Sequence, residues 1–246
     1  MTTNSASSWK PPPGWARCVY RALRGMARTV FRLAFRARSH DPARVPKSGP
    51  VLLVANHQSY LDPPLIGSMV THRELDYIAR MGLFKDPLMR ALMPVTNCIP
   101  IREQGGDAAA IREVLRRLEA GRAVLIFPEG TRTPDGAMRP FKRGVAVLVK
   151  RARCPVVPIA VEGCYDSWPR DREMPRFGGP CRVAVAYGEP IAYEELMGDG
   201  AEAGLARLAR IVDGMRLSLR AELRRASGGS FPPRGPGDEP IDRATE

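Results

Sequence analysis

The sequence predicts an α/β protein with a mostly parallel or mixed sheet that is flanked by helices. Three observations support this fold class. The chain has 246 residues, enough for one large α/β domain or two small ones. Short apolar runs alternate along it with longer segments whose apolar residues recur at helical spacing. Polar residues capable of chemistry directly follow several of these runs, and this is where parallel sheets place their sites.

The composition is that of a globular protein. Hydrophobic residues make up 44% and charged residues 26% of the chain, which excludes wholesale disorder, collagen and coiled coil. No apolar run approaches the ~18 residues of a membrane span, so we expect neither a transmembrane span nor a signal peptide. The five cysteines include no C-x-x-C pair and the three histidines are scattered. We therefore expect reduced thiols, no metal site and no cofactor.

The net charge of +12 is concentrated near the N-terminus. Residues 1–50 hold ten lysines and arginines but only one acid, Asp41, so they contribute +9. A partner attracted by this charge therefore meets the N-terminal region. The pI of 10.1 also allows nucleic acid. No recognition motif or aromatic-rich basic strand accompanies the charge, however, so no nucleic acid partner is expected.

Residues 14–38 predict a basic amphipathic helix. At about 100° per residue, its arginines fall within a sector of roughly 120° and most apolar residues lie opposite, although Phe31 and Phe35 fall on or near the basic side. Such a helix suits an anionic membrane interface. The alternative is a surface helix whose apolar stripe packs on the domain. The basic side consists of Arg17, Arg21, Arg24, Arg28, Arg32 and Arg36, and the apolar side of Trp15, Val19, Ala22, Met26, Val30 and Leu33.

The flanking regions differ in composition from the domain at residues 39–226. Residues 1–13 form a polar tail that ends in three prolines, and residues 39–50 form a proline-containing linker. Glycine, proline and charge dominate residues 227–246, so we expect a disordered tail there. Within the domain, strands are predicted where short apolar runs occur, at Val51–Ala55, Tyr77–Ala79, Cys98–Ile101, Ala123–Phe127, Val156–Val161 and Arg182–Tyr187.

Helices are predicted between these strands. Asp62 followed by two prolines is a helix-start signal. Asp107 caps a helix that stops at Gly121, and residues 201–225 carry apolar residues along one side. Two further helices are predicted around Pro87–Met93 and at Gly144–Arg151.

His57 and Asp62 form the first candidate site. His57 lies in the segment that follows the first predicted strand, and Asp62 opens the next helix. On one regular helix the two side chains would point about 140° apart, but a loop that enters a helix turns them together. Asp62 would then hold one ring nitrogen while the other takes a proton, as in acyl-transfer sites. A histidine with a purely structural role is the alternative.

A second candidate site follows the predicted strand Ala123–Phe127. Gly130 permits a tight turn that exposes backbone N–H groups. Thr131 supplies a hydroxyl, and Arg132 supplies a planar fork suited to a phosphate. The other cations that end or follow a strand are Arg102, Lys142 and Arg143. Together with His57, these residues place a base and a cluster of cations at strand ends.

Both segments resemble motifs of the glycerolipid acyltransferases of the 1-acylglycerol-3-phosphate acyltransferase type. Residues 56–62 resemble the N-H-x4-D motif, and residues 127–132 match the F-P-E-G-T-R motif letter for letter. The similarity covers about residues 40–220. Further resemblances are found at residues 99–102 for the second motif, 154–160 for the fourth motif and 188–191 for the C-terminal turn.

This resemblance implies a glycerol-3-phosphate acyltransferase-like fold and a role for each matched residue. His57 is implied to be the general base, Asp62 to orient it, and Pro158 to shape the acyl-donor side. Asn97 stands where the second motif often opens with glycine, and asparagine also tolerates left-handed backbone. The residues implied to bind the acceptor phosphate are Arg102, Glu129, Gly130, Thr131, Arg132 and Arg80, the last in a place where many relatives carry lysine.

The resemblance also implies a reaction. An acyl chain passes from acyl-CoA or acyl carrier protein to the sn-2 hydroxyl of 1-acylglycerol 3-phosphate, giving phosphatidic acid in phospholipid biosynthesis. The protein is then peripheral on the cytoplasmic face of the cell membrane, with residues 14–38 on the anionic surface. One alternative is an acyltransferase for another acceptor, such as lyso-ornithine lipid, glycerol 3-phosphate or another lysophospholipid. Another is a non-catalytic membrane- or nucleic-acid-binding protein.

Overall fold

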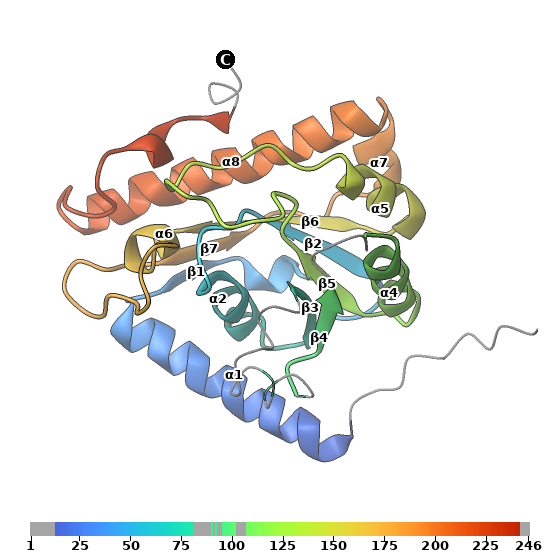
Figure 1. Ribbon diagram of the computed structural model, residues 1–246, viewed down its shortest axis with the longest axis horizontal. Helices are drawn as coiled ribbons and strands as arrows, with labels where there is room; N and C mark the ends of the chain where they lie inside the picture. Colours follow the sequence, from blue (N-terminus) through green and yellow to red (C-terminus); the bar gives the residue numbers. More distant parts are fainter. Residues whose placement is uncertain (1–12, 81–89, 91, 93–94, 102–106, 242–246) are drawn as a thin grey trace, which may run out of the picture.

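Seven strands form a single sheet in the computed structural model, which describes residues 13–80, 90, 92, 95–101 and 107–241 (Figure 1). The strand order is β1-β7-β6-β2-β5-β3-β4. Every neighbouring pair is parallel except β6 and β7, so the predicted fold class is confirmed. The strands are β1 Arg38–His40, β2 Val51–Ala55, β3 Leu75–Arg80, β4 Cys98–Ile101, β5 Ala123–Ile126, β6 Val156–Glu162 and β7 Ala184–Tyr187.

Helices cover both faces of the sheet (Figure 1). Helices α1 and α2 pack on one face, and α4, α5, α7 and α8 pack on the other. The predicted helix around Pro87–Met93 lies largely outside the described residues. The helices are α1 Gly14–Ala34, α2 Asp62–Met69, α4 Asp107–Glu119, α5 Gly144–Ala152, α6 Cys164–Ser167, α7 Tyr193–Met197 and α8 Ala201–Ala226, with 3-10 turns at Pro42–Arg44 and Pro236–Asp238.

The central strand β2 is buried on both sides. Val51, Leu53 and Ala55 belong to the core beneath α1 and α2, and Leu52 and Val54 belong to the core on the other face. A strand covered on both faces has a continuous apolar sequence, which is the pattern that predicted it. Its carboxyl end lies between the ends of β5 and β6, with which it pairs in parallel.

The N-terminal helix is shorter than the predicted 14–38. It ends at Ala34, Arg36 takes a left-handed backbone conformation with φ 45°, and Arg38–His40 pair with β7 as edge strand β1. A three-residue strand with polar side chains shows no apolar alternation, so the sequence pattern does not separate it from the helix.

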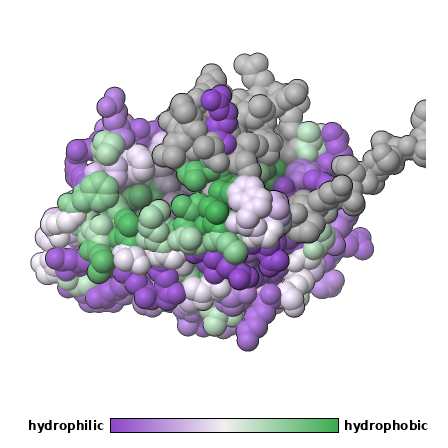
Figure 2. Space-filling view, turned by 90° about the horizontal axis from the view of Figure 1, so that it is seen from below, coloured by the Kyte–Doolittle hydropathy of each residue, from purple (hydrophilic) through white to green (hydrophobic). Residues whose placement is uncertain are grey.

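The apolar side of α1 faces away from the sheet. Trp15, Met26 and Leu33 are 63%, 60% and 77% exposed, whereas Tyr20 and Phe31 are buried against the body of the protein. Figure 2 views the molecule from the side of α1 and shows apolar residues gathered there in a band bordered by hydrophilic ones. The alternative in which this stripe packs on the domain is therefore wrong. No helix in the described ranges has both the length and the apolar character to cross a membrane.

Residues 227–241, where we expected a disordered tail, pack against the rest of the protein. Phe231 and Ile241 are buried, and Arg220 of α8 donates at 2.6 Å to a backbone carbonyl of the segment. The expected disorder is wrong here because apolar anchors and arginine donors offset a composition rich in glycine and proline. Residues 242–246 lie outside the described residues. We call residues 227–241 the C-terminal strap.

Candidate active site

The two candidate motifs meet at the carboxyl edge of the sheet. His57 lies in the loop after β2, and Glu129 to Arg132 lie in the loop after β5. These strands are adjacent and parallel, so their carboxyl ends emerge side by side. The amide of Thr133 donates to the carbonyl of His57 at 2.9 Å, which joins the two loops directly. The fold therefore brings the predicted base and the predicted cation together.

Asp62 holds the imidazole of His57. The distance between His57 Nδ1 and Asp62 Oδ2 is 2.8 Å, and the Asp62 side chain is fully buried. The carboxylate accepts a hydrogen bond from Nδ1–H, which leaves Nε2 unprotonated and able to accept a proton. Nε2 has no protein partner among the described residues. The ring also stacks on Phe127, with the ring centroids 4.1 Å apart, so its plane is fixed as well as its tautomer.

The same carboxylate oxygen organises the loop. Asp62 Oδ2 accepts from the amides of Gln58 and Ser59 at 2.6 and 2.7 Å. Asp62 is also the first residue of α2, where the partial positive charge of the helix start favours an anion. The two prolines that follow suit this first turn because neither requires an N–H partner. The local sequence thus turns His57 and Asp62 toward each other, as predicted.

Glu129 connects the second motif to the first. Its side chain is buried, Oε1 accepts from the His57 amide at 2.7 Å, and Oε2 accepts from the Arg139 amide at 3.0 Å. Burial raises the pKa of this carboxyl to about 8, although the two amides act to lower it. Because both of its oxygens accept backbone hydrogen bonds, the Glu129 side chain supports the His57 loop. The neighbouring residues of the motif are better suited than this carboxyl to bind an acceptor phosphate.

Gly130 has the left-handed backbone conformation that favours glycine. Its φ is +72°, and a Cβ atom there would lie 2.5 Å from Nζ of Lys142. The ammonium of Lys142 therefore lies against the turn, while Arg143 is 91% exposed and faces Glu202 at 3.6 Å. Of the two downstream cations, Lys142 joins the site and Arg143 does not.

Arg132 is the cation best placed for an anionic ligand. Its guanidinium lies over the ring of Tyr60, 3.6 Å from the centroid, and burial lowers its pKa from the ordinary value. No carboxylate of the described residues forms an ion pair with it. Tyr60 in turn contacts Trp168 with centroids 5.6 Å apart. Thr131 lies half-buried between Arg132 and Gly130.

The remaining predicted residues are not all part of this group. Pro158 is buried in the middle of β6, and a Cβ atom on Gly188 would lie 2.7 Å from its ring, so it packs within the sheet. Arg80 ends β3, with its side chain outside the description, and Arg102 lies outside the described residues. Asn97, which precedes β4, has φ 53°, which confirms the left-handed backbone expected where relatives carry glycine.

Sequence reasoning missed a polar network behind the His57 loop. Nε2 of Gln58 donates to Glu162 at 3.0 Å, and Glu162 pairs with Arg220 at 2.7 Å and Arg216 at 3.5 Å. Both arginines come from α8 and continue into contacts with the C-terminal strap. A signal was present, because Arg216 and Arg220 fall four residues apart among the apolar positions of α8. Asn56 adds a two-way bond with the backbone of Val161.

An imidazole held by a buried carboxylate, in a loop bonded to the loop that carries Arg132, suits the transfer of an acyl group to an anionic acceptor. Fold and site together thus place the chain among α/β acyl-transfer proteins. The chain belongs to the acyltransferase family, whose profile, described as Acyltransferase, matches residues 36–162. The resemblance noted on the two motifs is confirmed.

Several 1-acyl-sn-glycerol-3-phosphate acyltransferases are similar to this chain. A chloroplastic protein of Brassica napus is 29% identical over 138 residues, covering 55% of this chain and 40% of that protein. The alpha protein of Mus musculus is 32% identical over 165 residues, covering 63% and 54%. The Bacillus subtilis protein is 21% identical over 173 residues, covering 70% and 82%. The chain thus spans about half the length of the plant and mouse proteins.

A solved structure shows a similar fold. It is the crystal structure of the 1-acyl-sn-glycerophosphate (LPA) acyltransferase PlsC from Thermotoga maritima, with a TM-score of 0.66 and 23% sequence identity. The similarity covers 88% of this chain and 80% of that one. The fold implied by the motif resemblance is therefore confirmed.

The raised pKa of Glu129 predicts a pH-dependent stability. This carboxyl keeps its proton up to about pH 8 in the folded protein but loses it near 4.5 when exposed. Its contribution to folding is complete below pH 4.5 and is lost as the pH rises through 8. Between these limits the free energy of unfolding should fall, relative to that of Glu129→Gln, by up to about 1.4 kcal/mol per pH unit. Urea unfolding at about pH 5.5, 6.5 and 7.5 measures this difference, and parallel curves for the two proteins would contradict it.

Proposed function

We propose that the chain transfers an acyl group from a thioester donor to the free sn-2 hydroxyl of 1-acylglycerol 3-phosphate, giving phosphatidic acid. The observation that carries this proposal is the imidazole of His57, held by buried Asp62 at 2.8 Å, in a loop whose Tyr60 ring lies under the guanidinium of Arg132. The names of the similar proteins support the acceptor class. Acyl-CoA and acyl carrier protein both present the required thioester, and His57 treats both alike.

His57 acts as the base in this proposal. Nε2 takes the proton of the acceptor hydroxyl while the hydroxyl oxygen forms a bond to the thioester carbonyl carbon. Asp62 stabilises the imidazolium that results, because its carboxylate faces the protonated Nδ1. The tetrahedral intermediate then releases the thiolate, which takes the proton back from Nε2. Proton, acyl group and leaving thiol are thereby all accounted for without a covalent acyl-enzyme.

Arg132 binds the acceptor phosphate in this proposal. Its charge has no carboxylate partner among the described residues, and stacking on Tyr60 fixes the plane of its fork. The ammonium of Lys142, close against Gly130, adds a second cation on the same loop. Fixing the phosphate here places the glycerol hydroxyl near His57, because the two loops are joined by backbone contacts.

We also propose that α1 attaches the protein peripherally to an anionic membrane surface. Its exposed stripe offers Trp15, Met26 and Leu33 for insertion, with arginines along the flanks. The acceptor and product are membrane lipids, so this attachment keeps the site at its substrate. All five cysteines are free thiols, which favours the reducing cytoplasmic face.

Replacing His57 should nearly abolish turnover. Because a positioned base contributes about 10²–10⁴ in rate, His57→Ala should lower kcat by that factor in a protein that remains folded. The measurement is thiol release from oleoyl-CoA or an acyl carrier protein donor, with and without lysophosphatidic acid. His40→Ala is the matched control, since His40 lies on the surface and pairs with Glu222. Full activity in His57→Ala would refute the assignment. Equal thiol release with another lysolipid or with glycerol 3-phosphate would show that the acceptor is not restricted to lysophosphatidic acid.

Replacing Arg132 should chiefly weaken use of the acceptor. Loss of one charge-assisted contact costs about 1.5–3 kcal/mol, so Arg132→Gln should raise the KM for lysophosphatidic acid about 10- to 100-fold and leave the KM for the acyl donor within about twofold. Arg143→Gln removes an equal charge that faces away from the site, and it should leave both values unchanged. An unaltered acceptor KM in Arg132→Gln would remove Arg132 from the phosphate site.

Removing apolar surface from α1 should release the protein from vesicles. Met26→Ser/Leu33→Ser deletes two exposed side chains and should weaken partitioning into vesicles with anionic lipid at least about tenfold in a flotation assay. Val147→Ser is the control, because Val147 is 44% exposed on α5, on the opposite face of the sheet. Equal flotation of the two variants would show that α1 does not hold the membrane.

A further inference from the structure

A second basic pocket lies far from the candidate active site. It has a volume of about 530 Å³ and is bounded by α1 and by the segments that lead into β2, β3 and β5. These segments are at the amino edge of the sheet, whereas His57 is at the carboxyl edge. At about 3.3 Å per residue, the five residues of β2 separate the two edges by about 16 Å. The pocket is therefore a separate feature of the molecule.

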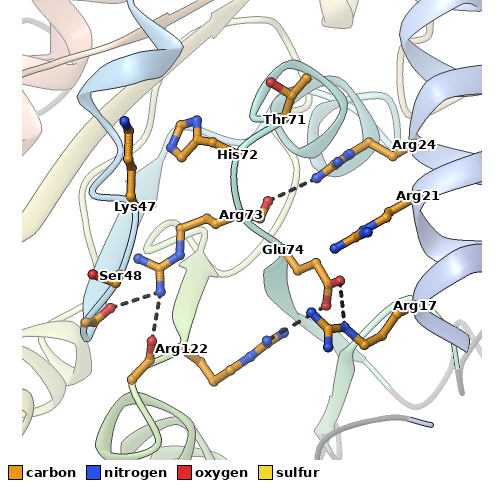
Figure 3. Close-up of a pocket in the computed structure, with 12 residues that line it drawn as sticks. Arg17, Arg21, Arg24, Lys47, Ser48, Thr71, His72, Arg73, Glu74 and Arg122 are labelled. Atoms are coloured by element: carbon orange, nitrogen blue, oxygen red, sulfur yellow. Dashed lines mark hydrogen bonds and ion pairs between the residues drawn. The ribbon is translucent and has the colours of Figure 1, made fainter. Parts of the chain in front are cut away.

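Every bounding segment contributes at least one cation to the lining of this pocket. Figure 3 shows Arg17, Arg21 and Arg24 extending from α1 toward Arg73 and Glu74. The cations that line it are Arg17, Arg21, Arg24, Lys47, Arg73 and Arg122. Glu74 is the one carboxylate among the lining residues, and it contacts Arg17 at 3.4 Å. Asp76, behind the pocket wall, is buried and pairs with Arg117 and Arg122.

Backbone carbonyls hold two of these cations, Arg73 and Arg24, in place without neutralising their charge. Arg73 donates to the carbonyls of Pro46, Gly49 and Gly121 at 2.8 to 2.9 Å. Arg24 donates to two further carbonyls at 3.1 and 3.2 Å. A carbonyl satisfies hydrogen bonds but carries no net charge, so the positive charge persists. Burial lowers the pKa of Arg73, and the charge of Arg122 lowers it further.

Two cations of the pocket have no protein partner. Arg21 and Lys47 are exposed, and neither forms a hydrogen bond or ion pair with any residue that the structure describes. The hydroxyls of Ser48 and Thr71 line the same space and add neutral donors. An open pocket with fixed arginines, free cations and hydroxyl donors has the composition of a phosphate site.

We propose that this pocket binds a phosphate group, as a second anion site remote from His57. Its chemistry fits the phosphate of a phospholipid headgroup, because α1 forms one wall and exposes its apolar stripe on the outside. A free phosphate offers the same group without acyl chains. The inference stands on the pocket alone and does not depend on the proposed acyl transfer.

The chain provides its own reporters for a test. It has three histidines, of which His72 lines this pocket, His57 lies in the candidate active site and His40 pairs with Glu222 elsewhere. Their imidazole NMR signals therefore report three regions separately, with His40→Gln and His57→Ala used for assignment. Soluble dihexanoyl phosphatidic acid and inorganic phosphate are titrated in parallel into the full chain.

The expected result is a saturable shift of the His72 signal. Arg21→Ala/Lys47→Ala should weaken this binding at least about tenfold, because it removes the two free cations. The control Arg32→Ala/Lys150→Ala removes the same charge from exposed positions outside the pocket and should change the dissociation constant less than about twofold. Saturation by inorganic phosphate identifies a free phosphate site, and a response to the lipid alone identifies a headgroup site.

Two results would overturn the proposal. One is a His72 signal that neither ligand moves, even where the His57 signal shifts. The other is an equal shift in the protein and in Arg21→Ala/Lys47→Ala. If this variant has a lower thermal unfolding temperature, Arg21→Gln/Lys47→Gln repeats the test with larger side chains.

Discussion

The buried carboxylate of Asp62 is the interaction on which the candidate active site depends. A single oxygen receives the imidazole of His57 and the amides of Gln58 and Ser59, all within 2.8 Å. A carboxylate without water around it is stable only with such donors, so the loop must close on it for the chain to fold. The orientation of the His57 ring and the local stability of its loop are therefore set by the same contacts.

This constraint extends well beyond the two motifs. Gln58 leads through Glu162 to Arg220 on α8, and Arg220 donates to the C-terminal strap. Burial raises the pKa of Glu162, and the charges of two arginines oppose this effect. Breaking one member of such a buried network leaves an uncompensated charge, so the members stabilise one another. Residues of α8 and the C-terminal strap consequently support the loop that carries His57.

The sheet and the central residues of the candidate site could be predicted from the sequence, because each leaves a signal within a short segment. Buried strands appear as apolar runs, and an acid followed by two prolines marks the start of α2. Contacts made by few residues leave no periodic signal. The edge strand Arg38–His40 has polar side chains, and the C-terminal strap depends on isolated anchors such as Phe231. The contacts of the network behind His57 join residues about 60 to 100 positions apart, which no single segment reveals.

The structure also changes what the N-terminal charge means. The sequence predicts a helix whose apolar side enters the acyl boundary of a membrane while its arginines lie near lipid phosphates. The apolar stripe is exposed as this requires, but Arg17 contacts Glu74 and Arg24 donates to backbone carbonyls of the domain. In the membrane attachment that we propose, the apolar stripe inserts and the arginines lie at its border, at the depth of lipid phosphates. Because some of that charge lines an open pocket, the site that we propose there can select a single phosphate group, which a uniformly basic surface cannot do.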